Sequence, residues 1–312
     1  MKKISSNTRL IRNILILMTI FSLFLSANIQ AEILTKDNIK IDEEANQDPG
    51  DVNYYALIIG VEIYGDHDFN EKMIKYADKI DDGAKKMYDL LNMTENFKEE
   101  NIKMILNENA TSEKIKESIT TWLDDREDEN DVVLIYITGH SWKIPFANRA
   151  KGHAFYFSYD VNTSEYSENA ITDIEFDTCI DTLESEHIVV IFDTCFSGRM
   201  LAVRQQGRTI LAAGGRYLFC PVDEDDNLGS GIFTYFLLQA FSGIADINND
   251  GWVTAKEAFT YAKMPVIRFT IWQKFPNFIQ IKPYFYISGP QIPYLYDNHL
   301  GSVKLIQYNT TM

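Results

Sequence analysis

Two residues that together can act as a nucleophile and a base, His140 and Cys195, each follow a run of apolar residues. The first run covers 132–137 and the second covers 188–192. Unbroken apolar runs of this length are typical of parallel strands that are buried on both faces. A cysteine attacks as its thiolate, and a histidine at the end of a neighbouring strand can help to generate that thiolate. The pair therefore predicts nucleophilic catalysis by a thiol.

Each of these residues taken alone also has a structural interpretation. A single histidine after a strand is usually a polar loop residue, and a single cysteine is usually a small buried hydrophobe. Cys179 fits the second description, because it lies on the apolar stripe of a helix that is expected to begin after Thr172. Cys220 precedes a proline and has no partner signature, so it stays unassigned. For His140 and Cys195, the joint pattern favours the functional interpretation.

The elements that must position this pair alternate between strands and helices. Apolar runs predict strands at 54–61, 132–137, 188–192 and 210–213. Apolar residues recur at helical spacing over 80–91, 115–123 and 232–241, and Thr172 and Glu175 form a capping box that would begin a further helix. This alternation predicts an α/β domain with a mainly parallel central sheet and helices on both faces.

Three motifs carry a resemblance to a known family. They are YYALIIGV from Tyr54, VVLIYITGHS ending at Ser141, and HIVVIFDTCFSG ending at Gly198. Their order and strand context resemble the caspase–metacaspase–legumain superfamily of cysteine peptidases. Cys195 follows His140 by 55 residues, close to the spacing of about 50 in caspases. The stretch GSGIFTYFLLQAFSGIADINNDGWVTAKEAF is similar to a helix and following segment of its bacterial and archaeal members. The resemblance covers about residues 53–265 and implies the caspase-like three-layer fold.

The resemblance also implies catalytic roles. Cys195 would be the nucleophile and His140 the general acid–base, and the backbone N–H groups of Ser141 and Cys195 would stabilise the oxyanion. Family members usually have glycine where this chain has Ser141. If that position required a conformation open only to glycine, the serine would distort the oxyanion site, and the bulky Trp142 would narrow the cleft. The alternative is therefore a catalytically inactive caspase-like module that binds peptides or partners.

Two aspartates are candidates for the substrate pocket. Asp193 lies two residues before Cys195, so both share a face at the strand end, and the resemblance implies a place for Asp193 in the S1 pocket. The alternative is a carboxylate that caps a nearby loop. Asp82 is a weaker candidate, one position away from the family's aspartate, where this chain has Gly83. A carboxylate in S1 predicts Arg or Lys before the cleaved bond, although legumain-like enzymes with an acid here prefer asparagine.

A second motif, independent of the first, predicts a calcium site in residues 246–257. The ligands at EF-hand spacing are Asp246, Asn248, Asp250, the carbonyl of Trp252, Thr254 through water, and Glu257 with both oxygens. Gly251 allows the sharp turn. The alternative is an ordinary turn in which Thr254 and Glu257 form a capping box. A calcium-dependent scaffold protein is the third functional alternative, and no cofactor is expected for the peptidase chemistry itself.

The chain ends and the overall charge complete the sequence prediction. Residues 1–31 read as a secretory signal peptide, with a basic start and an apolar run too short to span a membrane comfortably. Residues 32–52 are a polar linker, 53–290 form the peptidase domain, and 291–312 form a C-terminal tail. The net charge of −16 argues against nucleic-acid or anionic-membrane partners. We therefore expect a secreted protein that acts on peptides or proteins, without stable membrane association once the signal is removed.

Overall fold

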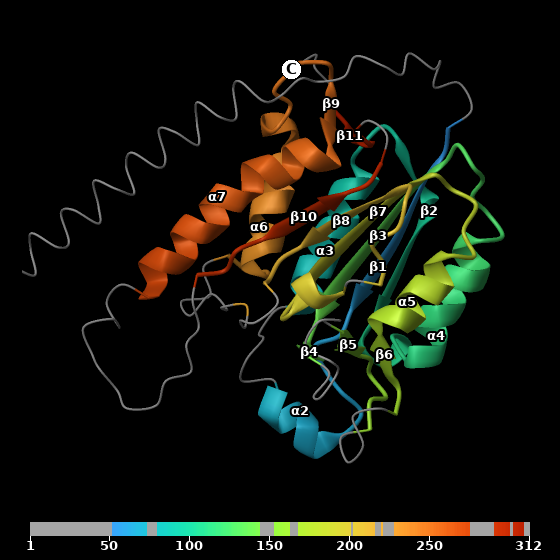
Figure 1. The fold of residues 1–312 in the computed structure, drawn as a ribbon, viewed down its shortest axis with the longest axis vertical. Helices are drawn as coiled ribbons and strands as arrows, with labels where there is room; N and C mark the ends of the chain where they lie inside the picture. The colour runs from blue at the N-terminus through green and yellow to red at the C-terminus, as the bar shows by residue number, and fades with distance from the viewer. Residues whose placement is uncertain are drawn as a thin grey trace, which may run out of the picture. The chain divides into compact units, whose positions relative to one another are not determined.

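The four apolar runs of the sequence form the inner strands of a six-stranded sheet (Figure 1). In sheet order the strands are β10 (Tyr294–Asp297), β8 (Arg208–Ala212), β7 (His187–Thr194), β3 (Val132–Gly139), β1 (Tyr54–Gly60) and β2 (Phe97–Leu106). All neighbours are parallel except β10 and β8. Strands β1 and β3 are buried along their whole length, which is why they consist of unbroken apolar residues. The predicted mainly parallel sheet is confirmed.

Helices cover both faces of the sheet and give three layers (Figure 1). On one face lie α4 (Ser112–Glu117), its wider continuation Ser118–Leu123, and α5 (Asp173–Ile180). On the other lie α3 (Ile80–Asn92), α6 (Ile232–Gln239) with its continuation Ala240–Ile244, and α7 (Ala255–Lys274). Alternate residues of β1 divide between the two faces, as a strand requires. Leu57 and Ile59 join the core under α4 and α5, whereas Ala56 and Ile58 join the core under α3 and α6.

Two small sheets extend the domain at opposite ends. Strands β4 (Ser141–Lys143), β5 (Ala154–Phe157) and β6 (Ala170–Thr172) form an antiparallel sheet that begins directly after His140. Strands β9 (Trp252–Thr254) and β11 (Lys304–Gln307) form a two-stranded sheet, and a short helix, α2 (His67–Met73), follows β1. The first small sheet fixes the direction of the chain as it leaves β3 beside the candidate catalytic histidine.

This computed structural model describes residues 52–73, 80–143, 153–162, 168–200, 202–215, 220, 228–274, 290–299 and 302–308. The predicted signal peptide at 1–31 and nearly all of the predicted linker at 32–52 lie outside these ranges. The prediction of a tail at 291–312 is wrong, because β10 extends the main sheet and β11 pairs with β9. Both strands have only four residues, too few for a periodic signal. No helix within the described ranges has the length and apolar character needed to cross a bilayer.

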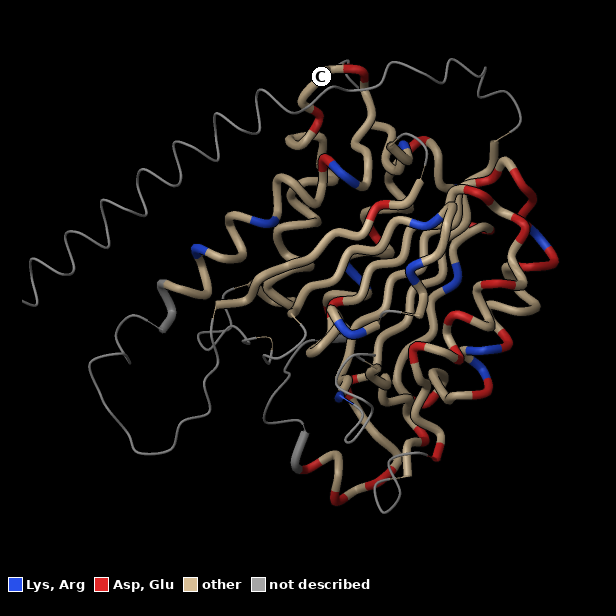
Figure 2. The backbone as a smooth tube through the Cα atoms, in the orientation of Figure 1, with Lys and Arg blue, Asp and Glu red and all other residues tan. Residues whose placement is uncertain are grey.

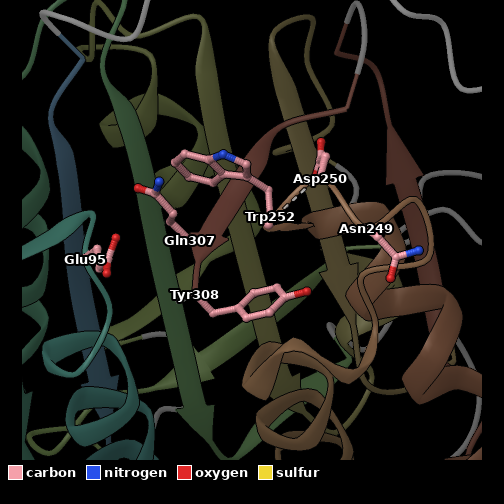
Figure 3. Close-up of a pocket in the computed structure, with 7 residues that line it drawn as sticks. Glu95, Asn249, Asp250, Trp252, Gln307 and Tyr308 are labelled. Atoms are coloured by element: carbon pink, nitrogen blue, oxygen red, sulfur yellow. Dashed lines mark hydrogen bonds between the residues drawn. The ribbon is translucent and has the colours of Figure 1, made fainter. Parts of the chain in front are cut away.

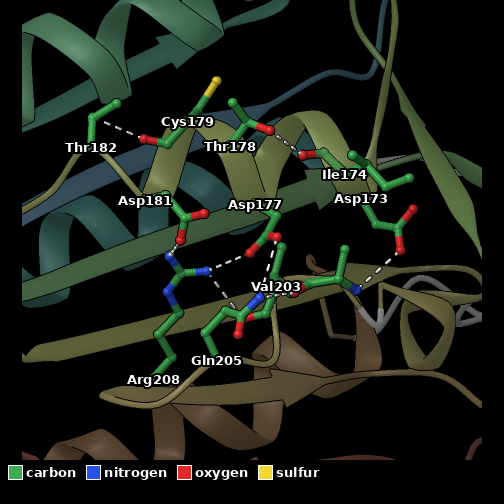
Figure 4. Close-up of polar contacts among 11 residues, drawn as sticks. Asp173, Ile174, Asp177, Thr178, Cys179, Asp181, Thr182, Val203, Gln205 and Arg208 are labelled. Carbon is green, nitrogen blue, oxygen red and sulfur yellow. Dashed lines mark hydrogen bonds and ion pairs between the residues drawn. The ribbon is translucent and has the colours of Figure 1, made fainter.

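A buried cation ties α5 to the sheet on the side where the chain continues beyond Cys195. Arg208 of β8 is 4 % exposed and donates to Asp177 at 2.8 Å and to Asp181 at 2.6 Å (Figure 4). It also reaches the carbonyl oxygen of Val203 at 3.4 Å. Because Val203 lies between Cys195 and β8, this cluster holds the outgoing segment against α5. Elsewhere, acidic residues are distributed over the outer helices and loops (Figure 2).

Candidate active site

The carboxyl ends of β3 and β7 place His140 beside Cys195. The two strands are parallel neighbours, and the last register pair is Gly139 opposite Thr194. His140 and Cys195 are the next residue on each strand. Neighbouring strands lie about 4.8 Å apart, so the two side chains begin at adjacent positions on one edge of the sheet. The arrangement supports the nucleophile–base pair predicted from the sequence.

Gly139 is the residue that allows β3 to turn into β4 at this point. Its φ is +147°, and a Cβ there would lie 2.9 Å from the ring of Tyr156 and 3.1 Å from the carbonyl oxygen of Val61. The hydroxyl of Tyr156 donates to the carbonyl oxygen of Thr138 at 2.9 Å. Glycine is therefore required by both conformation and space, and it lets the chain turn directly before His140.

His140 packs against aromatic residues that were not predicted from the sequence to belong to the site. It is buried, and its carbonyl oxygen accepts the N–H of Phe157 at 3.0 Å. Its ring centroid lies 6.0 Å from that of Tyr64, which packs edge-to-face on Phe69 at 4.9 Å. Burial raises the pKa of Tyr64 far above its usual value, so this side chain stays neutral. These packing contacts restrict the histidine ring, and no local motif marks the residues that make them.

Ser141 joins the two catalytic segments through its side chain. Its hydroxyl lies 3.0 Å from Thr194 Oγ1 and also contacts the carbonyl oxygen of Cys195. The concern about serine in place of glycine is not supported by the backbone. Among the described residues, the non-glycine positions with positive φ are Asn107, Asn169, Phe196 and Asn249. Ser141 therefore sits in β4 without the strain that a left-handed conformation would cause.

Strain occurs instead at the residue after the cysteine. Phe196 has a φ of +51°, a conformation that is uncommon for a bulky side chain and clusters at functional sites. Its ring packs edge-to-face on Trp142 at 5.4 Å, and Lys143 Nζ lies 5.9 Å from its centre. Trp142, expected to narrow the cleft, thus contacts the residue that follows Cys195. The surrounding packing holds the tight turn that presents the thiol at the sheet edge.

The environment of Cys195 favours its thiolate. Hydrogen bonds from Cys220 lower the pKa of the Cys195 thiol and outweigh burial and the nearby carboxylate of Asp193, which both raise it. The cysteine is partly exposed, whereas Cys179 is a residue of α5 that is buried in the core. All three cysteines are free thiols. Cys220 is the contact that sequence reasoning missed, since it carries no motif and lies 25 positions away.

The two predicted substrate-pocket aspartates are placed differently. Asp193 is buried, and its Oδ2 accepts the N–H of Thr234 at 3.1 Å and the Thr234 hydroxyl at 2.5 Å. It thus has a capping role, as in the alternative considered for it, but it caps the first turn of α6 and not a loop. Asp82 is half-exposed in α3 with Lys85 Nζ at 4.0 Å, while Gly83 packs near Ser230 and Thr234. The S1 role of these carboxylates stays a prediction.

The loop 246–257 has the folded backbone that its sequence suggests. The carboxylate of Asp246 accepts the N–H groups of Asn249 at 2.7 Å and Gly251 at 3.0 Å. Asn248 accepts the N–H of Asp250 at 3.0 Å, and Asp250 accepts the N–H of Trp252 at 2.9 Å. Gly251 has a φ of +83°, so the sharp turn uses the glycine as predicted. Asp246, Asn248 and Asp250 therefore lie along one tight turn, whereas Thr254 ends β9 and Glu257 lies in the first turn of α7.

The carboxylates of this loop also have protein partners. Tyr308 donates to Asp246 at 2.6 Å, and Lys304 Nζ lies 3.2 Å from Asp250. Glu257 accepts from the N–H and hydroxyl of Thr254 in the capping box considered as the alternative. Within the described ranges, no three His, Cys, Asp or Glu side chains converge as a metal site. The turn is present, but its acidic side chains are engaged with their neighbours.

A cavity of about 260 Å³ adjoins the same loop (Figure 3). Its lining residues come from the loop, from β11 and from the turn before β2: Glu95, Asn249, Asp250, Gly251, Trp252, Gln307 and Tyr308. The ring of Trp252 stacks at 5.9 Å on Tyr54, the first residue of β1. Because Cys195 follows the carboxyl end of the parallel strand β7, the cavity lies at the opposite end of the sheet from the catalytic pair.

Comparisons with known proteins agree with this geometry. The family model for the metacaspase peptidase C14 domain matches residues 55–204, which include both His140 and Cys195. Caspase-1 from Spodoptera frugiperda has a similar fold, with a TM-score of 0.51 and 11 % identity over 84 % of this chain and 92 % of that one. A structural-genomics protein from Geobacter sulfurreducens is similar, with a TM-score of 0.52 and 12 % identity over 83 % and 98 %. No curated protein matches the chain.

Proposed function

We propose that this chain, which belongs to the caspase-like superfamily of cysteine peptidases, hydrolyses peptide bonds with Cys195 as nucleophile and His140 as general acid–base. The observation that carries the proposal is the register of β3 and β7, which puts these residues side by side within the matched peptidase domain. The family implies protein or peptide substrates. No cofactor is needed for the chemistry.

The reaction proceeds in two steps. The Cys195 thiolate attacks the carbonyl carbon, forming a C–S bond, and the C–N bond breaks as His140 gives a proton to the leaving amine. Water then attacks the thioester while His140 accepts its proton, and the C–S bond breaks to release the acid and restore the thiolate. Backbone N–H groups of Ser141 and Cys195 would stabilise the negative charge on the carbonyl oxygen in both steps.

Two features favour an active enzyme over an inactive binding module or a calcium-dependent scaffold. Ser141 occupies its position without left-handed backbone strain. The hydrogen bonds from Cys220 lower the pKa of the nucleophile, which a merely structural cysteine does not need. An inactive module would bind peptides, but its Cys195 would not react with a peptide that carries an electrophilic group.

A covalent probe tests this proposal. A peptide that carries an acyloxymethyl ketone should add its mass to Cys195, as measured on the intact protein and located by peptide mapping. His140→Ala should slow the labelling strongly, whereas Cys179→Ala should leave it unchanged. If the probe labels Cys195 no faster than it labels a denatured sample, the thiol is not activated by the fold and the proposal fails.

For specificity, we propose a basic residue before the cleaved bond, with Asp193 facing it and Asp82 nearby. The support is the buried position of Asp193 two residues before the nucleophile. Only its Oδ2 bonds to Thr234 in the hydrogen bonds given above. A buried carboxylate is stabilised by a cationic partner. A cleavage profile dominated by Asn or Asp before the bond would reject this assignment.

We further propose that the protein is exported and acts outside the cytoplasm after removal of residues 1–31. The support is the basic start and apolar run of the sequence. Sequencing the N-terminus of protein recovered from the culture medium or from the cell envelope tests it. A mature chain that begins at Glu32 is expected, and a chain that still begins at Met1 would contradict the proposal.

Finally, we propose that calcium binds the loop 246–257, with Asp246, Asn248, Asp250, Trp252, Thr254 and Glu257 as ligands. The loop backbone supports it, because successive N–H groups are already bonded to the side chains of Asp246, Asn248 and Asp250. The contacts of Lys304 and Tyr308 with the carboxylates oppose it. The ion would play a structural or regulatory part, since the loop lies at the end of the sheet remote from Cys195.

A further inference from the structure

Cys220 contacts the sulfur atom of the proposed nucleophile directly. Its backbone N–H donates to Cys195 Sγ across 3.4 Å, and its thiol donates to the carbonyl oxygen of Thr194 at 3.3 Å. The Cys220 side chain also lowers the pKa of the Cys195 thiol. Cys220 thus contacts both the sulfur atom of Cys195 and the backbone immediately before it. These two contacts can fix the position of the proposed nucleophile.

The end of β8 is built to admit this contact. Gly214 lies two residues beyond β8, and a Cβ at that position would be 2.5 Å from Cys220 Sγ. The same glycine is fixed by hydrogen bonds to the segment after the nucleophile. Its N–H donates to Ser197 Oγ at 2.9 Å, and its carbonyl oxygen accepts the N–H of Gly198 at 2.9 Å. The space for the Cys220 thiol therefore exists only because residue 214 has no side chain.

The other groups around Cys195 explain why such a support matters. Asp193 from β7 is a buried carboxylate whose negative charge disfavours a second one nearby. Tyr64, which is buried and neutral, and His140 approach from β1 and β3. The hydroxyl of Ser141 in β4 contacts Thr194 Oγ1 and the carbonyl oxygen of Cys195. Cys220 supplies a backbone N–H that donates to the sulfur itself.

We propose that Cys220 is a positioning residue for the nucleophile, whose N–H and thiol hold the sulfur atom of Cys195 and favour its thiolate. A hydrogen bond to a charged sulfur stabilises the ionised form. The pKa shifts agree in direction, since the pKa of Cys195 is lowered and that of Cys220 is raised well above its usual value. The inference rests on the proposed function only in taking Cys195 as the nucleophile.

The test measures thiolate formation without requiring turnover. The rate of alkylation of Cys195 by iodoacetamide is followed against pH by peptide mass spectrometry, with reductant present so that both thiols stay reduced. Cys220→Ala removes the thiol donor and keeps the N–H. It should move the midpoint upward by about one pH unit, equivalent to about 1.4 kcal/mol, and should slow alkylation about tenfold below both midpoints.

Three further variants separate hydrogen bonding from packing. Cys220→Ser keeps a donor and should restore most of the shift. Gly214→Ala displaces the Cys220 thiol without removing it and should also raise the midpoint, which provides a second test if Cys220→Ala fails to fold. Cys179→Ala is the matched control with an unchanged midpoint. A Cys220→Ala profile that superimposes on wild type, or equal shifts for Ala and Ser, would overturn the inference.

Peptide cleavage by the same proteins distinguishes the two proposals. If wild type cleaves no peptide but the alkylation midpoints shift as expected, the peptidase function fails and the role of Cys220 toward the thiol stands. If wild type cleaves peptides while Cys220→Ala alters neither the alkylation midpoint nor the pH profile of kcat/KM, the role assigned to Cys220 is refuted and the function is retained.

Discussion

The proposed catalytic residues are packed against neighbours that are far away in the sequence. His140 and Cys195 could be found because each follows a buried strand and because their order and spacing match a family pattern. Tyr64, Phe157 and Cys220 reach the same site only through tertiary packing. No spacing rule relates a tyrosine after β1, or a cysteine beyond β8, to the end of β7. The sequence therefore points to the candidate reacting groups, whereas it carries no signal for the residues that pack around them.

Asp193 provides a residue-scale test of capping against substrate binding. Asp193→Ala leaves the N–H of Thr234 without its acceptor at the start of α6, and should cost about 1–2 kcal/mol of unfolding free energy in urea titration. Asp193→Asn keeps an acceptor and should cost less. If Asp193 also binds a basic side chain, the Asn variant should lose activity on Arg and Lys peptides at near-normal stability. Equal activity of the Asn variant on all peptides would leave Asp193 with the capping role alone.

At the scale of elements, strands could be predicted where burial requires a run of apolar residues. The inner strands β1, β3, β7 and β8 have a strand on each side, and each contains an apolar run that is buried. Edge strand β2 buries only Phe97, Ile102 and Ile105 of its ten residues. Strands β4, β6, β10 and β11 are only three or four residues long. Such strands form because the rest of the fold supplies their partners. Their own composition does not predict them.

The Arg208 cluster predicts how strongly α5 is attached to β8. Arg208→Met should lower the free energy of unfolding by about 3 kcal/mol, because Asp177 is left nearly buried without its cation. This loss is at the lower end of the range for broken buried ion pairs, because the second partner, Asp181, has a side chain that is 57 % exposed. Lys116→Met breaks a half-exposed pair with Glu175 and should cost less than about 1 kcal/mol. Similar losses for the two variants in urea titration would show that the cluster is not a buried anchor.

Calcium should stabilise the domain through the loop between α6 and α7. Extracellular sites of this kind have dissociation constants on the order of 10⁻⁴ to 10⁻³ M, and calcium at ~100 times that value would add roughly 2.7 kcal/mol. The melting temperature is measured with calcium and with chelator. Glu257→Gln should abolish the difference while keeping the capping acceptor of α7, because glutamine can still accept from Thr254.

Lys304 offers the opposite variant for the same loop. Its ammonium group lies 3.2 Å from Asp250, so Lys304→Met should strengthen calcium binding in calorimetry by freeing that carboxylate. The melting temperature of wild type should also rise with calcium. If neither wild type nor Lys304→Met releases heat with calcium and both melt alike in chelator, the loop is an ordinary turn.

At the scale of the whole molecule, a histidine pair makes stability depend on pH. His187 Nδ1 lies 2.6 Å from His299 Nε2, and burial together with the neighbouring His299 lowers the pKa of His187 below its usual 6.5. The folded protein therefore binds fewer protons than the unfolded chain just below pH 6.5. The free energy of unfolding should fall as the pH drops from 6.5 toward the lower pKa of His187 in the folded protein. Above pH 6.5, His187 should cause no loss of stability.

Thermal melting between pH 7.5 and pH 5 checks this sign. His187→Gln should make the acid-dependent fall in melting temperature smaller. His67→Gln, at a side chain that is 82 % exposed, should leave the fall unchanged. A steeper fall on acidification for His187→Gln than for wild type would contradict the assignment.

The central proposal is that Cys195 and His140, at the carboxyl ends of β7 and β3, hydrolyse peptide bonds. The most direct measurement is the digestion of a proteome-derived peptide library by the purified protein, read by mass spectrometry. Wild type should produce new termini with a shared residue before the cut, and Cys195→Ala, His140→Ala and the double variant should all lose cleavage to a similar extent because the two residues act as a unit. The same termini produced by folded Cys195→Ala would contradict the account.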